Sequence, residues 1–176
     1  QTMAGYITHT LEISPKIIIT DGARYSQVTL RAKFNDTAFF PFPFSEVLQK
    51  NGALNGNLGL ILMPGQEWRF AMLGSTGFRA PNIDDLSKVF ESIPGKVIVP
   101  NPELKPEKTY NGEISLSKGF NEAVKLETTG YFTRYKNVIT SGKSQFNGMD
   151  SIMYNGTLSE VLSNFNKTTA YIYGTS

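Results

Sequence analysis

Residues that could carry chemistry are scarce in this sequence. His9 is the only histidine among 176 residues and there is no cysteine, which excludes a cysteine nucleophile, a disulfide and a cysteine-based metal site. His9 with a nearby serine or aspartate could suggest a hydrolase. It lies inside an alternating stretch, however, and no Gly-x-Ser-x-Gly turn is present to expose a serine nucleophile. We therefore expect no catalytic residue and no enzyme activity.

One group of acidic residues could hold a cation. Asp84, Asp85 and Glu91 have the carboxylate oxygens that Ca²⁺ prefers. Adjacent aspartates in a connection are usually solvated, and the Asp-x-Asp-x-Asp-Gly spacing of a calcium loop does not occur. We predict neither a metal nor a cofactor.

Composition narrows the remaining classes of protein. The length suits one domain, and a net charge of +2 without a lysine–arginine stripe argues against a nucleic-acid partner. The sequence contains no run of about 18 apolar residues, so no transmembrane helix is expected. The sequence opens and ends inside strand-like patterns, at 1–14 and 168–176, and lacks the regions of a signal peptide. We therefore expect a fragment of a longer protein.

Apolar and polar side chains alternate along most of the chain, which is the pattern of β-strands. Two segments have a helical pattern instead. The first is 45–52, with Ser45 as an N-cap and Gly52 as a stop; the second is 82–90, with room for one or two turns. The alternation predicts seven strands, near 4–13, 17–32, 57–63, 67–79, 109–118, 123–139 and 168–174.

The connections between these strands alternate in length. Short connections at 14–16, 64–67 and 118–123 alternate with long ones at 33–56, 80–108 and 140–167. In an antiparallel meander this order places every tight turn at one edge and every long loop at the other, as in outer-membrane barrels. Several predicted strands also reach the roughly 9–11 residues that a tilted strand needs to cross the hydrocarbon layer. We predict an all-β fold, an antiparallel meander of about seven strands that forms part of a large outer-membrane β-barrel.

Each predicted strand has one apolar face. In a large barrel the apolar face meets lipid and the polar face surrounds a wet lumen, although a soluble sandwich would also bury one face. Asp21 is a difficulty, because it shares the parity of Ile17 and Ile19 and would face lipid. Either a β-bulge shifts the register there or the parity assigned to this strand is wrong. The polar face carries Arg69, Glu113, Ser115, Lys125, Glu127 and Thr129.

Two motifs around the second long connection resemble those of TonB-dependent outer-membrane receptors. In that family a barrel strand ends in Phe-Arg-Ala-Pro-Asn, and Asn-Pro-x-Leu-Lys-Pro-Glu opens the next strand. Weaker similarities are DGARYS at 21–26, LGLILMPGQEWRF at 58–70, GYFTRYKNVI at 130–139, which resembles a strand end at an asparagine, and AYIYGTS at 170–176. The matching residues of the paired motif are Phe78, Arg79, Ala80, Pro81, Asn82, Asn101, Pro102, Leu104, Lys105, Pro106 and Glu107.

The resemblance implies that residues 1–176 are part of a barrel of about 22 strands around a plugged lumen. The plug, the TonB box and the remaining strands would then lie outside this sequence. Such receptors import a scarce solute, such as a siderophore, haem, cobalamin or a glycan, across the outer membrane of Gram-negative bacteria. The implied partners are outer-membrane lipid, an unidentified small ligand and a TonB-type inner-membrane protein that supplies energy through the plug; no nucleic acid is implied.

The aromatic run at 39–44 is unusual for a connection. In a receptor's outer loop, its aromatic residues could contact a hydrophobic ligand such as a porphyrin or a siderophore, or pack against neighbouring loops or a partner. The rival to the receptor is a soluble all-β binding or interaction module. The aromatic residues concerned are Phe39, Phe40, Phe42 and Phe44.

The paired motif also has a physical meaning of its own. Pro81 removes a ladder donor and ends the strand, and it restricts Ala80 to extended geometry. Asn82 can cap the turn or helix that follows. Arg79 and Glu107 carry opposite charges at the ends of neighbouring strands, so we hypothesise an ion pair near the rim; the alternative is that both side chains are merely solvated.

Overall fold

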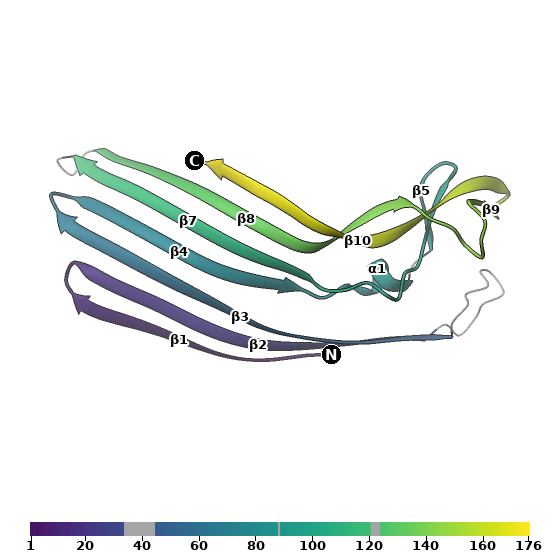
Figure 1. The fold of residues 1–176 in the computed structure, drawn as a ribbon, viewed down its shortest axis with the longest axis horizontal. Helices are drawn as coiled ribbons and strands as arrows, with labels where there is room; N and C mark the ends of the chain where they lie inside the picture. The colour runs from purple at the N-terminus through teal and green to yellow at the C-terminus, as the bar shows by residue number, and fades with distance from the viewer. Residues whose placement is uncertain (34–44, 88, 121–123) are drawn as a thin grey trace.

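The computed structural model describes residues 1–33, 45–87, 89–120 and 124–176. These residues form one sheet of ten strands in the order β1-β2-β3-β4-β7-β8-β10-β6-β5, with β9 beside β10 (Figure 1). The long strands form an antiparallel meander in which each pairs with the next long strand along the chain. They are β1 (Thr2–Ser14), β2 (Ile17–Lys33), β3 (Glu46–Gly65), β4 (Trp68–Arg79), β7 (Glu107–Phe120), β8 (Val124–Lys143) and β10 (Thr157–Thr175).

The predicted all-β meander is confirmed, with strands that are longer than the alternation indicated. The helix expected at 45–52 is wrong, because β3 begins at Glu46 and pairs with the outer part of β2 as far as Lys33. Pairing with a neighbouring strand gives the backbone N–H and C=O groups of this segment their hydrogen bonds, and this outweighs the local helical pattern. Three short strands also lie inside the long connections: β5 (Phe90–Ile93), β6 (Lys96–Val99) and β9 (Ser151–Tyr154).

The short connections lie together at one end of the sheet and the long ones at the other, as the sequence predicted (Figure 1). The β3–β4 turn is tight because Gly65, Gln66 and Glu67 all have positive φ, at 122°, 51° and 61°. At the opposite end β6 pairs in parallel with β10, and β9 folds back as a hairpin on β10. The short strands of the connections at 80–106 and 144–156 thus extend the same sheet beyond β10.

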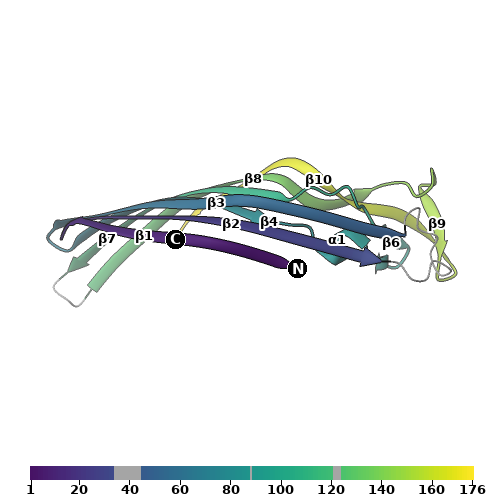
Figure 2. The ribbon, with the colours of Figure 1, turned by 90° about the horizontal axis from the view of Figure 1, so that it is seen from below.

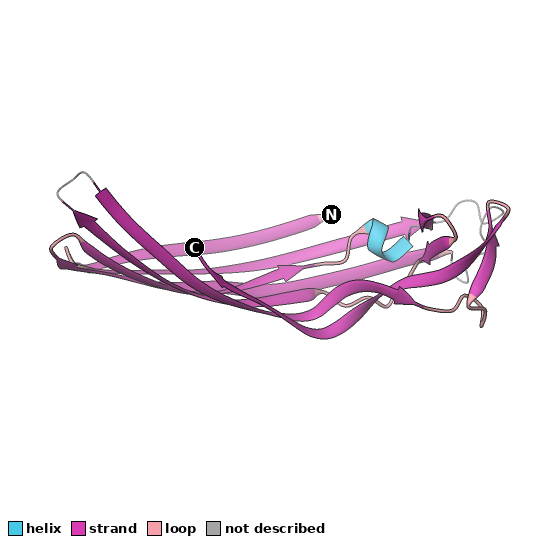
Figure 3. Ribbon diagram, turned by 90° about the horizontal axis from the view of Figure 1, so that it is seen from above, coloured by secondary structure: helices cyan, strands magenta, loops and turns pink. Residues whose placement is uncertain are grey.

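The sheet is curved, and the single described helix, α1 (Ile83–Ser87), lies on its concave side (Figures 2 and 3). The expected helical turns at 82–90 are therefore confirmed for 83–87. No described helix is long and apolar enough to cross a membrane.

Two small clusters of buried side chains hold the described structure together, and both lie towards the long connections. One joins α1 and residues 101–107, the second of the paired motifs and here called the return motif, to the sheet. Its buried members are Ala32, Val47, Leu86 and Leu104. The other joins β6, β9 and β10 through Val97, Val99, Ile152 and Val161. The central and inner parts of the long strands contribute to neither cluster, so their stability in the protein must come from what surrounds the sheet.

Candidate functional site

The two faces of the sheet differ sharply in polarity. Residues that pair across neighbouring strands share a face, and Leu58 pairs with Asp21 on one side and with Gly74 on the other. This convex face is apolar and uncovered, since Leu58 is 62% exposed. The polar set that begins with Arg69 and Glu113 lies on the concave face, where α1 also packs. The face assignment made from the sequence is confirmed.

Aromatic side chains border the apolar band of the convex face at both ends. Near the tight turns Trp68 stacks on Phe70, with ring centroids 5.9 Å apart, and the Lys118 ammonium lies 4.8 Å from the Trp68 ring. Towards the long connections, Tyr110 lies under the Lys136 ammonium at 5.5 Å. Since Tyr110 pairs with the residue at 76 on β4, the band covers 68–76 of that strand, close to the roughly 9–11 residues needed to cross a bilayer. Paired aromatic girdles of this kind mark the two membrane interfaces of a barrel.

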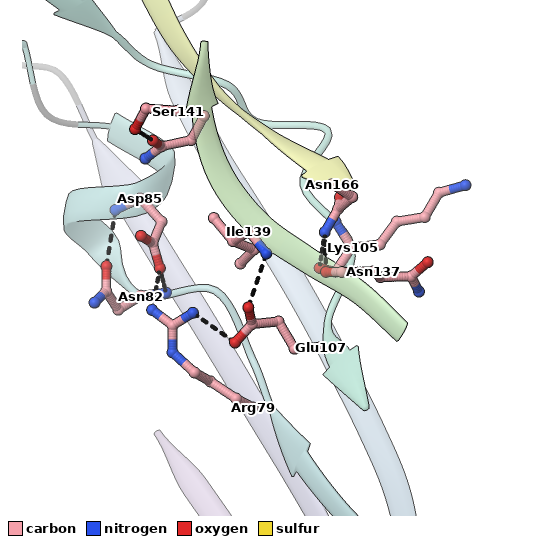
Figure 4. Close-up of polar contacts among 10 residues, drawn as sticks. Arg79, Asn82, Asp85, Lys105, Glu107, Asn137, Ile139, Ser141 and Asn166 are labelled. Atoms are coloured by element: carbon pink, nitrogen blue, oxygen red, sulfur yellow. Dashed lines mark hydrogen bonds and ion pairs between the residues drawn. The ribbon is translucent and has the colours of Figure 1, made fainter. Parts of the chain in front are cut away.

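Arg79 is the centre of an ion-pair network where β4 ends (Figure 4). Its Nη1 lies 2.8 Å from Glu107 Oε2, and its Nη2 lies 2.8 Å from Asp85 Oδ2. Glu107 is held in place from the other side, because its Oε1 accepts a hydrogen bond from the backbone N–H of Ile139 at 2.7 Å. The hypothesised pair between Arg79 and Glu107 is confirmed, and Asp85 joins it as a second acid.

Asn82 caps α1, as its position after Pro81 predicted. Its Oδ1 accepts the Asp85 N–H at 2.8 Å, and Asp85 Oδ2 accepts the Asn82 N–H at 3.1 Å. This reciprocal arrangement satisfies donors that a helix start would otherwise leave without a partner. Because Asp85 also binds Arg79, the end of β4 and the start of α1 are fixed by the same carboxylate.

The return motif is held by Asn166 of β10, a residue that the sequence analysis did not single out (Figure 4). Asn166 Oδ1 accepts the Lys105 N–H at 2.7 Å, and its Nδ2 donates to the carbonyl oxygens of Lys105 and Asn137 at 2.8 and 2.7 Å. Asn137 has a left-handed φ of 57°, which asparagine tolerates better than most residues. The strand predicted near 123–139 continues past Asn137 as far as Lys143.

The return motif lies across the concave face. Gln49 Nε2 donates to the carbonyl oxygens of Pro102 and Leu104 at 2.8 and 3.0 Å, and the Leu104 side chain is buried against the sheet. Asn101 bonds to the backbone of Asn164 at 2.8 Å. The two motifs together therefore narrow the outer mouth of the concave channel. Nothing in the local sequence marks Gln49, because the two carbonyl oxygens that it binds are more than fifty residues away.

Deeper on the concave face is an open hollow of about 300 Å³. Arg24 is its one charged lining residue, and the Arg24 Nε donates to Ser26 Oγ at 3.0 Å. The side chains that line it on this face are Tyr6, Thr8, Arg24, Asn55, Asn57 and Ser75. Neutral amides, hydroxyls and one guanidinium can bind a polar or anionic group, and they include no acid or base paired for catalysis.

The other candidate residues are not brought together. Asp85 binds Arg79 and Asn82, whereas Glu91 accepts the Gly95 N–H within the β5–β6 hairpin. No group of three metal-ligating side chains occurs in the described part of the chain. His9 lies on the convex face beside Asp21 and not in the concave channel. Phe39, Phe40, Phe42 and Phe44 lie outside the described residues.

A curved antiparallel sheet with a lipid-compatible convex face, a polar concave face and one-sided long loops defines the wall of an outer-membrane β-barrel. The chain matches the family model for the TonB-dependent receptor-like β-barrel over residues 1–174. It belongs to that family, whose members are outer-membrane transport receptors of Gram-negative bacteria and not enzymes. The soluble module considered from the sequence is not favoured.

Solved structures agree with this fold at low sequence identity. The hemophore receptor HasR of Serratia marcescens, solved with its hemophore HasA and heme, aligns with a TM-score of 0.76 at 12% identity over 99% of this chain. The copper transporter OprC aligns with a TM-score of 0.70 at 13% identity, and the siderophore receptor PirA of Pseudomonas aeruginosa with 0.63 at 17%, each over 99% of this chain. This chain covers 30%, 25% and 38% of those three structures, respectively. No curated protein sequence matches.

Proposed function

We propose that this chain is a section of the barrel wall and outer loops of a receptor that imports a scarce solute across the outer membrane. The solute classes in view are those inferred from the resemblance: a siderophore, haem, cobalamin or a glycan. A plug inside the complete barrel and a TonB-type inner-membrane protein would couple import to energy. Residues 1–176 would then be one part of a larger domain, and they would contribute no catalytic group.

The observation that carries this proposal is the contrast between the two faces. An uncovered apolar convex face requires lipid, and a polar concave face requires water or a polar occupant. Onto the concave face the two motifs fold a helix and a loop, which narrows the channel mouth beside Gln49. The structure of HasR contains heme, which supports transport as the general activity. It does not identify the solute of this chain.

The test uses the full-length receptor that contains these residues. A deletion strain would be assayed for uptake of radiolabelled ferric siderophores, haem and cobalamin, and for growth on glycans as sole carbon source, each with and without a protonophore. We expect one solute class to depend on both the receptor and the energised inner membrane. Uptake of every class at the wild-type level in the deletion strain would overturn the proposal.

Two adjacent positions provide a matched pair of variants. Asn55 faces the concave hollow, and Leu54, next to it, faces outwards and is 73% exposed. Asn55→Trp should reduce uptake because the indole fills the hollow, whereas Leu54→Trp should leave uptake unchanged because aromatic residues suit a membrane interface. Equal effects of the two variants at equal receptor levels would contradict a concave transport path.

A further inference from the structure

A group of cations lies on the convex face, just beyond the outer aromatic girdle. Lys108 of β7 pairs directly with Lys136 of β8, and Arg134 lies two residues from Lys136 on the same face of β8. Lys108 is also the next outward residue after Tyr110 on β7. The three side chains therefore lie where the apolar band meets the headgroup layer of a membrane. We call Lys108, Arg134 and Lys136 the outer cation patch.

No acid balances the outer cation patch within the described part of the chain, since none of its three side chains forms an ion pair there. Like charges directly opposite each other destabilise a sheet, and Lys108 and Lys136 are such a pair. A bound anion would remove this repulsion, and the exposed side chains of Lys108 and Arg134 can reach one. The residues that flank the patch on this face are all uncharged: Thr76, Phe78, Tyr110, Thr169 and Tyr171.

On the side of the patch towards the tight turns, the convex face has a hollow of about 650 Å³. Gly74 and Gly112 pair with each other there, and no heavy atom lies within 4 Å of the position that a Cβ would occupy on either residue. The hollow is thus a place where two neighbouring strands lack side chains inside the apolar band. The outward side chains around it are Leu58, Leu60, Met72, Ile114 and Phe132.

The outer cation patch and the hollow lie on one line along β7. Gly112 is four residues from Lys108, or about 14 Å along a strand, and Tyr110 lies between them. An anionic group at the patch is therefore at the level of the lipid headgroups. The hollow, in contrast, is at the level of the hydrocarbon. One molecule with an anionic head and an apolar chain can occupy both.

We propose that the outer cation patch and the hollow together bind one phosphorylated lipid of the outer leaflet. The planar guanidinium of Arg134 suits a phosphate, and the two lysines add charge. An acyl chain of the same molecule fills the space beside Gly74 and Gly112. A lipid is favoured over a free anion because the charged and the apolar part of the site lie at the depths of a headgroup and its chain. The proposal depends on the outer-membrane placement of the barrel and not on the transported solute.

Native mass spectrometry of the full-length receptor in mild detergent tests the charged part of the site. The probe is lipid A, which carries phosphates and acyl chains, and inorganic phosphate is the second probe. We expect one lipid A to bind the wild type. Lys108→Gln/Lys136→Gln should bind it about 25-fold more weakly, because each cation near an anionic lipid contributes about fivefold.

Arg31→Gln/Lys33→Gln is the matched control, because it removes the same charge from the same face. The β2–β3 register is continuous from Ile17 to Lys33, so no bulge occurs at Asp21, its outward parity is correct, and Arg31 and Lys33 share it. Arg31 is already paired with Glu46, so this variant should bind lipid A nearly as the wild type does. Equal losses in both double variants, or inorganic phosphate binding as tightly as lipid A, would overturn the proposal.

A variant of Gly112 tests the hollow separately. Gly112→Leu places a side chain in open space, and leucine suits a lipid-facing surface, so the barrel should still fold and insert. It should weaken lipid A binding by roughly threefold or more, because it takes the place of the acyl chain, and Gly112→Ala should weaken it less. Unchanged affinity in Gly112→Leu would reject the hollow as part of the site. Since binding and not uptake is measured, such a result leaves the proposed function intact.

Discussion

The Arg79 network permits a quantitative test of how the paired motif works. In Arg79→Gln two carboxylates lose their counter-ion, and both are well shielded, since the side chains of Asp85 and Glu107 are only 15% and 14% exposed. Hydrogen bonds to charged groups contribute about 1.5–3 kcal/mol, whereas exposed ion pairs contribute about 0.2–1 kcal/mol. Because Arg79 itself is 48% exposed, we expect a cost of about 1–2 kcal/mol.

This cost should be local, because the network fixes α1 and the start of β7 to the end of β4. Hydrogen-exchange mass spectrometry of the full-length receptor in detergent can measure it. Amides at 83–87 and the Ile139 amide, which donates to Glu107, should exchange roughly 5–30 times faster in Arg79→Gln. Amides in the membrane-spanning part of β3 should be unaffected.

Arg31→Gln is the matched control. Arg31 also makes a two-point contact with a carboxylate, Glu46, at 2.7 and 3.0 Å. That pair is more open, with side chains 58% and 32% exposed, so its loss should change local exchange by less than the Arg79 substitution does. If α1 exchanges at the wild-type rate in Arg79→Gln, the motif residues are merely solvated and the reasoning fails.

Three further outcomes follow from particular positions. Leu58→Arg should impair outer-membrane assembly, because an arginine that faces lipid near the midplane destabilises a barrel by about 2–4 kcal/mol. Asn57→Arg, on the concave face, should not impair it. Equal fractions of heat-modifiable, folded barrel for the two variants on gels would contradict the face assignment. Asn166→Ala should speed hydrogen exchange at Lys105, since it removes three hydrogen bonds and about 1–3 kcal/mol, and unchanged exchange there would exclude Asn166 as the anchor. The hydrogen bond from Lys143 of β8 lowers the pKa of Glu160 of β10, so this pair stabilises the contact between the two strands above the ordinary glutamate pKa of about 4.3, and its contribution is lost as the pH falls further. Glu160→Gln should flatten the pH dependence of hydrogen exchange at the outer ends of β8 and β10, and a profile identical to the wild type would argue against it.

The paired motif shows how far local sequence could predict this structure. Pro81 and Asn82 act on their immediate neighbours, so a strand end and a helix cap could be inferred at those positions. The partner of Arg79 could also be inferred, because antiparallel order places Glu107 at the same end of the next long strand. Asp85 as a second partner, and Asn166 as the anchor of the return motif, depend on how distant segments fold back onto the concave face.

The helix prediction for 45–52 was wrong for the same physical reason. Its local pattern suits a helix, but the outer part of β2 presents an open ladder of donors and acceptors that β3 completes. Long-range pairing of this kind leaves little trace in a short window of sequence.

The alternating faces, the one-sided long loops and the family could be inferred from the sequence alone, because side-chain period and turn spacing are local properties of the chain. Three arrangements are visible only in the fold: Asp21 meets His9 on the lipid side, the motifs lie across the channel mouth, and β6 joins β10 in parallel. The contact of Asp21 with His9 depends on the register of the β1–β2 hairpin, and the other two arrangements bring together segments that are distant along the chain. Register and long-range contact are set by the whole sheet.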